Sequence, residues 1–224
     1  MKNNILIMKK TTLLLLVFSS IFYLNAFSQK IYTSADVFTE KKMVWYGLDF
    51  THCKFIGQPT IHGNFYKAPD YVVKYFFRDW NMIPLKEGEK YDIGKAFDKD
   101  YIYFDIDTVL ARGQRYKSDS LIAFSNAYTL NTTTFPDVIK SYGGIASEGI
   151  GVVYLVESYN SINELATYYC IVFDVASKKI LLQEKITGRP QGGSVKTYWA
   201  GAFREALEKN VKVYKKWKKG AMVK

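Results

Sequence analysis

Two aspartates placed two residues apart have the type and spacing that come nearest to catalytic chemistry in this sequence. Asp105 and Asp107 fall in the alternating segment 101–109, which the pattern predicts to be a strand. Side chains two apart on a strand point to the same face, so we expect the two carboxylates side by side. Such a pair can hold a divalent cation or act as acid and base in hydrolysis. The alternative is a solvated strand end, because exposed carboxylates are the usual state.

A glycine-rich loop, G-R-P-Q-G-G-S at residues 188–194, precedes a predicted helix. The free N–H groups at a helix N-terminus can receive an anion, and Arg189 and Lys196 could assist as ligand-binding residues. The loop lacks the spacing of a nucleotide-binding P-loop. The alternative interpretation is a simple connection from strand to helix.

Histidine and cysteine are too few for the common metal and nucleophile sites. His52, His62 and Cys53 do not reach the four Cys or His ligands of a structural zinc site, so we expect no metal and no cofactor. No G-x-S-x-G elbow is present, and we assign no catalytic residue. Cys53 and Cys170 could form a disulfide in an oxidising compartment, or they could be two buried free thiols in apolar strands.

Lysines at the end of the chain account for most of its net charge of +10. Residues 29–211 carry 22 basic and 21 acidic side chains, because three basic residues precede this range and six follow it. Without a basic groove, nucleic acid is excluded as a partner. The tail, residues 211–224, could bind an anionic membrane or glycan surface, or it could be a frayed helix end. The residues of this surface-binding tail are Lys212, Lys215, Lys216, Trp217, Lys218 and Lys219.

The elements that must position these residues follow strand and helix periodicities. We expect strands at 42–50, 101–109 and 121–130, and then a β-meander at 151–158, 166–175 and 180–187. We expect helices at 70–81, 134–142 and 195–216, with Asp70 capping the first helix and Pro84 stopping it. The sequence predicts a single α+β domain over 29–224. Its mixed or antiparallel sheet has about five or six strands, with about three helices, and the long C-terminal helix packs on the sheet.

Residues 1–28 have the three parts of a cleavable secretory signal peptide. Three lysines form a positive n-region, residues 13–24 form an apolar h-region, and Ala26 and Ser28 are the small residues before a cut at Gln29. The apolar run is shorter than the roughly 20 residues that span a bilayer. We therefore expect a mature protein that starts near Gln29 and is periplasmic or secreted.

Two stretches of the C-terminal half resemble known exported proteins. One is G-I-G-V-V-Y-L-V-E-S at 149–158, followed by 169–174 and the turn at 177–179; the other is Gly192-Gly193 followed by Tyr198-Trp199-Ala200 and Ala202. Together they resemble uncharacterised exported proteins of the Bacteroidetes group. Their order of elements also resembles the periplasmic α/β domain shared by curli-secretion lipoproteins and outer-membrane activators of penicillin-binding proteins. The resemblance covers about residues 149–217, and the lipobox Cys of those lipoproteins is absent. It implies a fold and a compartment, but no reaction.

These observations favour a non-enzymatic protein of the cell envelope with a binding or assembly role and an envelope protein as partner. Aromatic residues make up 17 % of the chain, and aromatic side chains are enriched at interfaces. Two alternatives stay open. One is an exported hydrolase that uses Asp105 and Asp107, and the other is attachment to anionic surfaces through the lysine tail.

Overall fold

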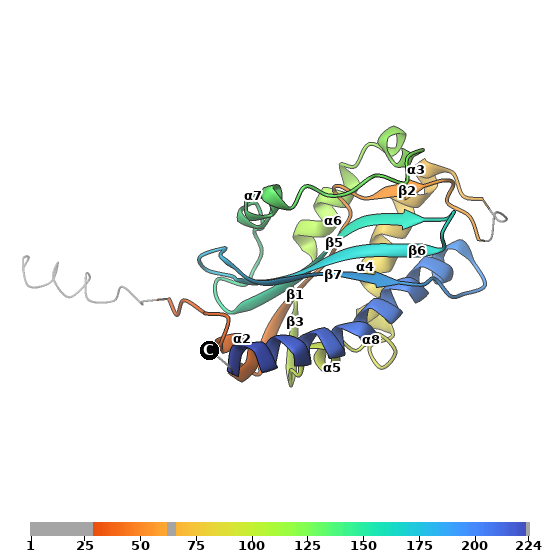
Figure 1. The fold of residues 1–224 in the computed structure, drawn as a ribbon. Coiled ribbons are helices and arrows are strands. Elements are labelled where there is room, and N and C mark those ends of the chain that lie inside the picture. Colours follow the sequence, from red (N-terminus) through yellow and green to blue (C-terminus); the bar gives the residue numbers. More distant parts are fainter. Residues whose placement is uncertain (1–28, 62–65, 223–224) are drawn as a thin grey trace, which may run out of the picture. The chain divides into compact units, whose positions relative to one another are not determined.

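A mixed β-sheet around one long central strand organises the described residues, which are 29–61 and 66–222 (Figure 1). Residues 1–28, which are predicted to be a signal peptide, lie outside these ranges, and so does His62. The central strand β5 (Ile150–Asn160) is buried along its whole length, as its continuous apolar run predicts. It pairs antiparallel with β6 (Leu165–Asp174), which pairs antiparallel with β7 (Ile180–Gly188). The predicted β-meander is therefore confirmed.

The other edge of β5 carries two parallel strands placed end to end. β1 (Lys42–Asp49) pairs with the first half of β5 and β2 (Lys54–Ile56) with the second half. β3 (Tyr101–Phe104) lies parallel to β1, and β4 (Ile122–Ala123) lies parallel to β2. The described strands number seven, and four of their six pairings are parallel. Of the predicted alternatives, the mixed sheet is therefore confirmed and the antiparallel one is wrong, and the described strands exceed the five or six expected.

Helix α8 (Val195–Met222) lies across one face of the sheet (Figure 1). Phe203 stacks on Trp45 of β1, with ring centroids 5.9 Å apart, and also contacts Tyr154 of β5. The prediction of a long C-terminal helix packed on the sheet is confirmed, but the helix continues beyond residue 216. The lysine tail is thus helical where it is described, and Trp217 is half-buried against the core.

The remaining helices are short, and most of them lie between strands in the order of the chain. They are α2 (Asp36–Thr39), α3 (Pro69–Tyr71), a π-helical turn (Val72–Phe76), α4 (Phe77–Lys86), α5 (Ile93–Phe97), α6 (Asp107–Gln114) and α7 (Phe135–Lys140), with 3-10 turns at Ser118–Ser120 and Thr132–Thr134. The described chain therefore has more than the three helices expected. Among these residues, no helix is long and apolar enough to cross a membrane.

Two predicted features of the helix at 70–81 are wrong. Its N-cap is Ala68, with Pro69 in the first turn, and not Asp70. Pro84 lies inside α4, which ends at Lys86. A proline removes one hydrogen bond of the helix ladder, and this loss is tolerated so close to the end. The Glu87 N–H donates to Ile83 O and closes the last turn.

The strand predicted at 101–109 stops at Phe104, and the one predicted at 121–130 is confined to Ile122–Ala123. β3 stops because α4 occupies the edge of β1 beyond that point. The side chain of Asn81 accepts from Leu48 N (2.7 Å) and donates to Leu48 O (3.0 Å), so it takes both backbone groups that a longer β3 would need. The chain turns instead into α6.

Candidate functional site

The two aspartates do not form a pair on one strand face. Asp105 follows the end of β3 and is buried, whereas Asp107 is exposed in the first turn of α6. Asp105 Oδ2 accepts a hydrogen bond from Ala146 N (3.0 Å), and its Oδ1 is buried without a hydrogen-bond partner among the described residues. The prediction of adjacent carboxylates is therefore wrong, because the alternation on which it depended ends at Phe104. Asp105 anchors a loop instead.

The glycines of the loop at 188–194 serve close packing. A Cβ at Gly188 would collide with Ala202 O, and one at Gly192 would collide with the backbone of Thr197 and Tyr198. A Cβ at Gly201 in α8 would likewise collide with the backbone of Gln191. The start of α8 is capped internally, since Ser194 Oγ accepts from Thr197 N (3.2 Å). These contacts make the loop a tight connection between β7 and α8.

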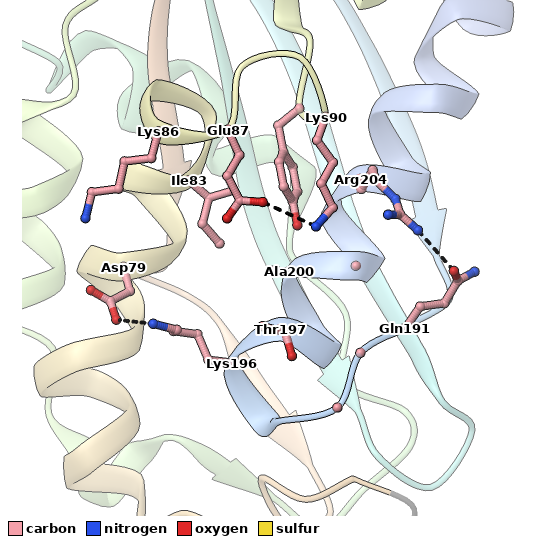
Figure 2. Close-up of a pocket in the computed structure, with 14 residues that line it drawn as sticks. Asp79, Ile83, Lys86, Glu87, Lys90, Gln191, Lys196, Thr197, Ala200 and Arg204 are labelled. Atoms are coloured by element: carbon pink, nitrogen blue, oxygen red, sulfur yellow. Dashed lines mark hydrogen bonds and ion pairs between the residues drawn. The ribbon is translucent and has the colours of Figure 1, made fainter.

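Lys196 nevertheless lines a cleft of about 420 Å³ between α4 and the start of α8 (Figure 2). Arg189 does not line it, and its backbone N–H donates to Glu205 (2.8 Å). Figure 2 shows that the basic groups of the cleft are largely paired: Lys196 with Asp79 (3.2 Å), Lys90 with Glu87 (3.2 Å), and Arg204 with Gln191 (3.1 Å). The structure therefore does not bring Arg189 and Lys196 together, and acids of the cleft already neutralise Lys196 and Lys90.

The two cysteines are buried, two of the tail lysines lie near acids, and Lys212, Lys215 and Lys219 are exposed. Cys53 and Cys170 are buried free thiols, and burial raises the pKa of both. Lys216 lies 3.9 Å from Glu184, and Lys218 lies 3.5 Å from Asp98. The described residues contain no cluster of three or more Cys, His, Asp or Glu side chains that could hold a metal ion.

A groove of about 670 Å³ lies beside β3, on the sheet face opposite α8. Tyr101 and Tyr103 form one side and are 67 % and 47 % exposed, which is far more than packing requires of an aromatic ring. We call this feature the tyrosine groove and define it by six of its lining residues: Tyr32, Val44, Tyr101, Tyr103, Ile145 and Glu148. Its volume is within the range of ligand-binding clefts, and its lining is largely apolar.

The wall opposite the tyrosines is the loop of residues 145–149, and hydrogen bonds to Asp105 and Val175 fix its position. Asp105 accepts from Ala146, and Gly149 O accepts from Val175 N (2.9 Å). Gly144 has φ +139 and lies directly against the Asp105 carboxylate, where a Cβ would collide. Asp105, the residue that the spacing singled out, thus positions the groove.

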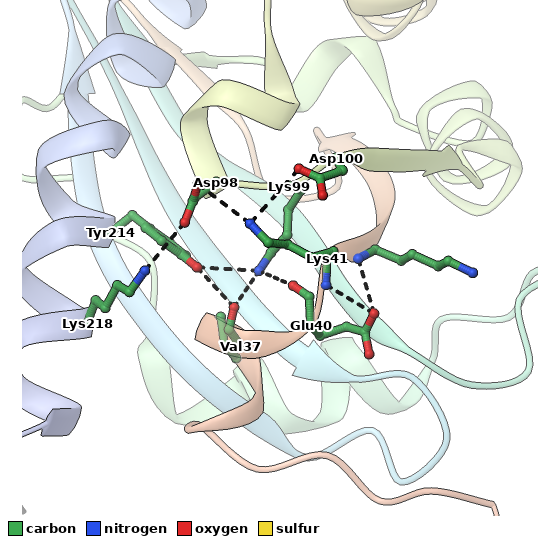
Figure 3. Close-up of polar contacts among 9 residues, drawn as sticks. Val37, Glu40, Lys41, Asp98, Lys99, Asp100, Tyr214 and Lys218 are labelled. Atoms are coloured by element: carbon green, nitrogen blue, oxygen red, sulfur yellow. Dashed lines mark hydrogen bonds and ion pairs between the residues drawn. The ribbon is translucent and has the colours of Figure 1, made fainter.

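The end of the groove near the start of β3 is held by a buried lysine (Figure 3). Lys99 Nζ donates to the carbonyls of Val37 and Glu40, the latter at 2.7 Å, and lies 3.4 Å from the hydroxyl of Tyr214 in α8. Lys41 O accepts from the N–H groups of Asp100 (3.0 Å) and Tyr101 (3.2 Å). Burial lowers the pKa of Lys99 to about 8. The lysine thus ties the chain before β1 to β3 and α8.

The mouth of the groove at Tyr32 is rich in acids. Burial has the largest effect and raises the pKa of Tyr32. Nearby carboxylates raise it further, because each negative charge opposes ionisation of the phenol. In decreasing order of effect, these carboxylates belong to Glu40, Glu148, Asp174 and Asp36. Tyr32 N donates to Asp174 Oδ2, which fixes the chain at this end. A basic group on a ligand would be stabilised here.

Sequence reasoning missed most of the groove. The exposure of Tyr101 and Tyr103 could have been predicted from their alternation with Ile102 and Phe104, which marks a second strand face. Nothing local distinguishes Lys99, which lies between two aspartates like a surface residue, or predicts its contact with Tyr214 in α8.

The fold and the groove define the protein coarsely, as a mixed α/β protein with a groove beside an edge strand. No family model matches the chain. No curated protein matches it. Among solved structures, the crystal structure of lipoprotein GNA1162 from Neisseria meningitidis is similar over 69 % of this chain and 83 % of that chain, with 10 % sequence identity and a TM-score of 0.29. A TM-score this low assigns neither a family nor a function, so the resemblances to Bacteroidetes and curli-secretion proteins stay predictions.

Proposed function

We propose that this protein is an exported, non-enzymatic protein of the cell envelope that binds an extended segment of a partner protein in the tyrosine groove. The segment would add to β3 as a further strand and place alternate side chains against Tyr101 and Tyr103. In this mode of recognition, backbone hydrogen bonds supply affinity and the neighbouring groove supplies specificity.

One observation carries the proposal: β3 is an open edge strand with exposed tyrosines beside a pre-built groove. β3 pairs with β1 on one side, and no described strand pairs with its other side. All four of its side chains are at least partly exposed, whereas seven of the eight in β1 are buried. An unpaired edge offers a row of free N–H and C=O groups that a partner strand can satisfy.

The chemistry of the groove describes the occupant. Val44 and Ile145 offer apolar contact, so the segment should have apolar residues at alternate positions. Glu40 and Glu148 line the same groove and outnumber Lys42, the one cation among its described lining residues, so they favour a basic residue at the end near Tyr32. The expected occupant is therefore an extended, apolar and basic segment of another protein.

Export is supported by the pattern of residues 1–28 and is part of the proposal. The hydrolase alternative gains no support from the geometry, because Asp105 is buried under a loop and Asp107 is on a helix. Binding of anionic surfaces through the lysine tail would have to use a helix whose Trp217 is already half-buried against the core.

Peptide selection on the purified mature protein tests the function. Random peptides about ten residues long, near the upper length of a natural strand, would be selected for binding. The selected peptides would then be titrated against the wild type and two double variants. Tyr101→Ser/Tyr103→Ser removes the rings of the groove. Tyr71→Ser/Tyr75→Ser is the matched control, because these tyrosines are 42 % and 43 % exposed and do not line the groove.

We expect apolar and basic peptides whose affinity falls at least about tenfold in the groove variant and stays unchanged in the control. Hydrogen exchange should slow at the amides of β3 when peptide binds, because an added strand protects them. Peptides that bind both double variants alike, or that leave exchange in β3 unchanged, would refute the proposal.

A further inference from the structure

The sheet edge is interrupted between β1 and β2, and the interruption is built by specific contacts. Asp49 Oδ1 accepts from Thr51 N (2.8 Å) and from the Thr51 hydroxyl (2.5 Å), which turns the chain at the end of β1. Cys53 N donates to Phe50 O (2.9 Å) before β2 begins. The chain therefore leaves the sheet at the carboxyl end of β1, next to α6.

An arginine is fixed at this opening by a buried carboxylate. Arg112 Nε lies 3.2 Å from Asp49 Oδ2 and 2.9 Å from the Thr51 hydroxyl, and Arg112 Nη1 donates to Ser141 Oγ (2.6 Å). The ring of Tyr142 lies beneath the guanidinium, 5.2 Å away, and its hydroxyl donates to Asp49. These contacts use Nε and Nη1, while Nη2 has no partner among the described residues. The guanidinium is thus held in one orientation, as a ligand-binding group must be.

Arg112 opens onto a surface pocket of about 640 Å³ between α6, the turn after it, and the loop that follows α7. We call it the arginine pocket and define it by Thr51, Arg112, Arg115, Lys117, Ser141 and Gly143. Among the described residues, no acidic side chain lines it, and Asp107 and Asp119 are close in sequence but outside it. It shares no lining residue with the tyrosine groove.

The pocket has an excess of positive charge. Asp49 neutralises Arg112, but Arg115 donates only from Nε, to Ala111 O (3.3 Å), and Lys117 has no ion-pair partner within residues 29–61 and 66–222. The two uncompensated cations leave a net charge of about +2, which matches the charge of about −1.5 to −2 on a phosphate monoester near neutral pH. Guanidinium groups also fit the geometry of phosphate oxygens better than an ammonium does.

We propose that the arginine pocket binds a phosphate monoester group. Its position agrees with the general rule that α/β sheets bind ligands outside the carboxyl ends of their parallel strands. The group could be part of a small molecule or of a lipid headgroup, and the chemistry of recognition is the same for both. This site is independent of the tyrosine groove and of the partner proposed for it.

Two probes test the site on the mature protein and distinguish these sources. Inorganic phosphate would be titrated by calorimetry, and vesicles of phosphatidylcholine with or without phosphatidic acid would be tested by sedimentation. The test variant is Arg115→Gln/Lys117→Gln, since both residues are exposed and their removal should leave the fold intact. Arg112 is left in place, because its loss would leave Asp49 buried and unpaired. The charge-matched control is Lys212→Gln/Lys219→Gln on the exposed side of α8.

We expect saturable phosphate binding that weakens about tenfold or more in the test variant and not in the control. Binding to phosphatidic acid vesicles that follows the same pattern would identify a lipid headgroup, and its absence would identify a small molecule. The proposal fails if the wild type binds neither probe, or if the control loses affinity as much as the test variant does. In the second case general surface charge accounts for the binding.

Discussion

The tyrosines at the centre of the sheet and those on β3 are the same residue type in opposite situations. Tyr154, Tyr159 and Tyr168 are fully buried, and Tyr159 stacks on Trp199 with ring centroids 4.9 Å apart. Tyr101 and Tyr103 are exposed, and no ring contact joins them to another aromatic residue in the described part of the chain. The first group is accounted for by packing, whereas the second is not. An aromatic surface without a packing role, on an open edge strand, is the feature on which the proposed binding function rests.

The two regions also differ in what holds them. The central strands lie between α8 on one face and α7 with its following loop on the other, and aromatic contacts fill the space between them (Figure 1). The groove beside β3 is held by isolated polar contacts, from Asp105 to one wall and from Lys99 to one end. Substitutions should therefore have large effects in the first region and local effects in the second.

The largest loss of stability should come from a substitution in the core. Trp45→Ala should lower the free energy of unfolding by about 3–5 kcal/mol, because Trp45 is fully buried between Phe203 and Tyr154. Tyr103→Ala, on the neighbouring strand, should change it by less than about 0.5 kcal/mol. Urea unfolding of both variants measures the difference. Equal losses would mean that Tyr103 is part of the core.

Lys99→Met should lower the free energy of unfolding by about 1–3 kcal/mol at neutral pH, because the carbonyls of Val37 and Glu40 lose a buried donor. Peptide binding in the groove should weaken as well, since Glu40 lies at the groove and beside the lysine. Hydrogen exchange at residues 37–42 checks that the loosening is local. A variant with unchanged exchange there would contradict the anchoring role.

The same lysine predicts a pH dependence. Its pKa is about 8 when folded and about 10.5 when unfolded, so between these values the unfolded state binds more protons and stability rises with pH. Below pH 8 both states are protonated and the burial of the charge is a constant cost. The charged neighbours are Asp98, Lys41, Glu40 and Lys218. The stability difference between wild type and Lys99→Met, measured at pH 7 and 9.5, should therefore shift in favour of the wild type at the higher pH.

Gly144→Ala should lower the free energy of unfolding by about 1–2 kcal/mol, because φ is +139 and the new Cβ would meet the Asp105 carboxylate. The matched control is Gly143→Ala, where a Cβ meets nothing within 4 Å and the change should be below about 0.5 kcal/mol. Thermal unfolding of the pair, followed by peptide titration, tests whether Asp105 holds the groove wall. Equal behaviour of the two variants would argue against it.

The smallest expected effect is a gain in stability. Tyr46→Phe should raise the free energy of unfolding by about 1 kcal/mol, because the Tyr46 hydroxyl is buried without a hydrogen-bond partner within the described ranges. Burial and then the Asp105 charge raise the pKa of Tyr46, so its proton stays in place. Tyr142→Phe is the opposite case and should destabilise, since that hydroxyl donates to buried Asp49. The two changes should have opposite signs in denaturant titrations.

Much of the fold could be predicted because it depends on local periodicity. The continuous apolar run of β5, the two strands after it and the apolar stripe of α8 have repeats of two and 3.6 residues that identify each element without its neighbours. The same alternation was misleading at Asp105 and Asp107. It indicates which face a residue occupies only while the strand lasts, and the contact of Asn81 with Leu48 ends β3 first.

Residue type and spacing alone were enough to predict β1, the β-meander and α8 with their apolar faces, and the near-neutral charge of residues 29–211. The tertiary structure decided which tyrosines are covered, where β3 ends, which lysine is buried, and that Arg112 meets Asp49 beside an open pocket. These features join residues far apart in the chain. Burial and pairing depend on the surroundings that distant segments provide, and no local repeat encodes those surroundings.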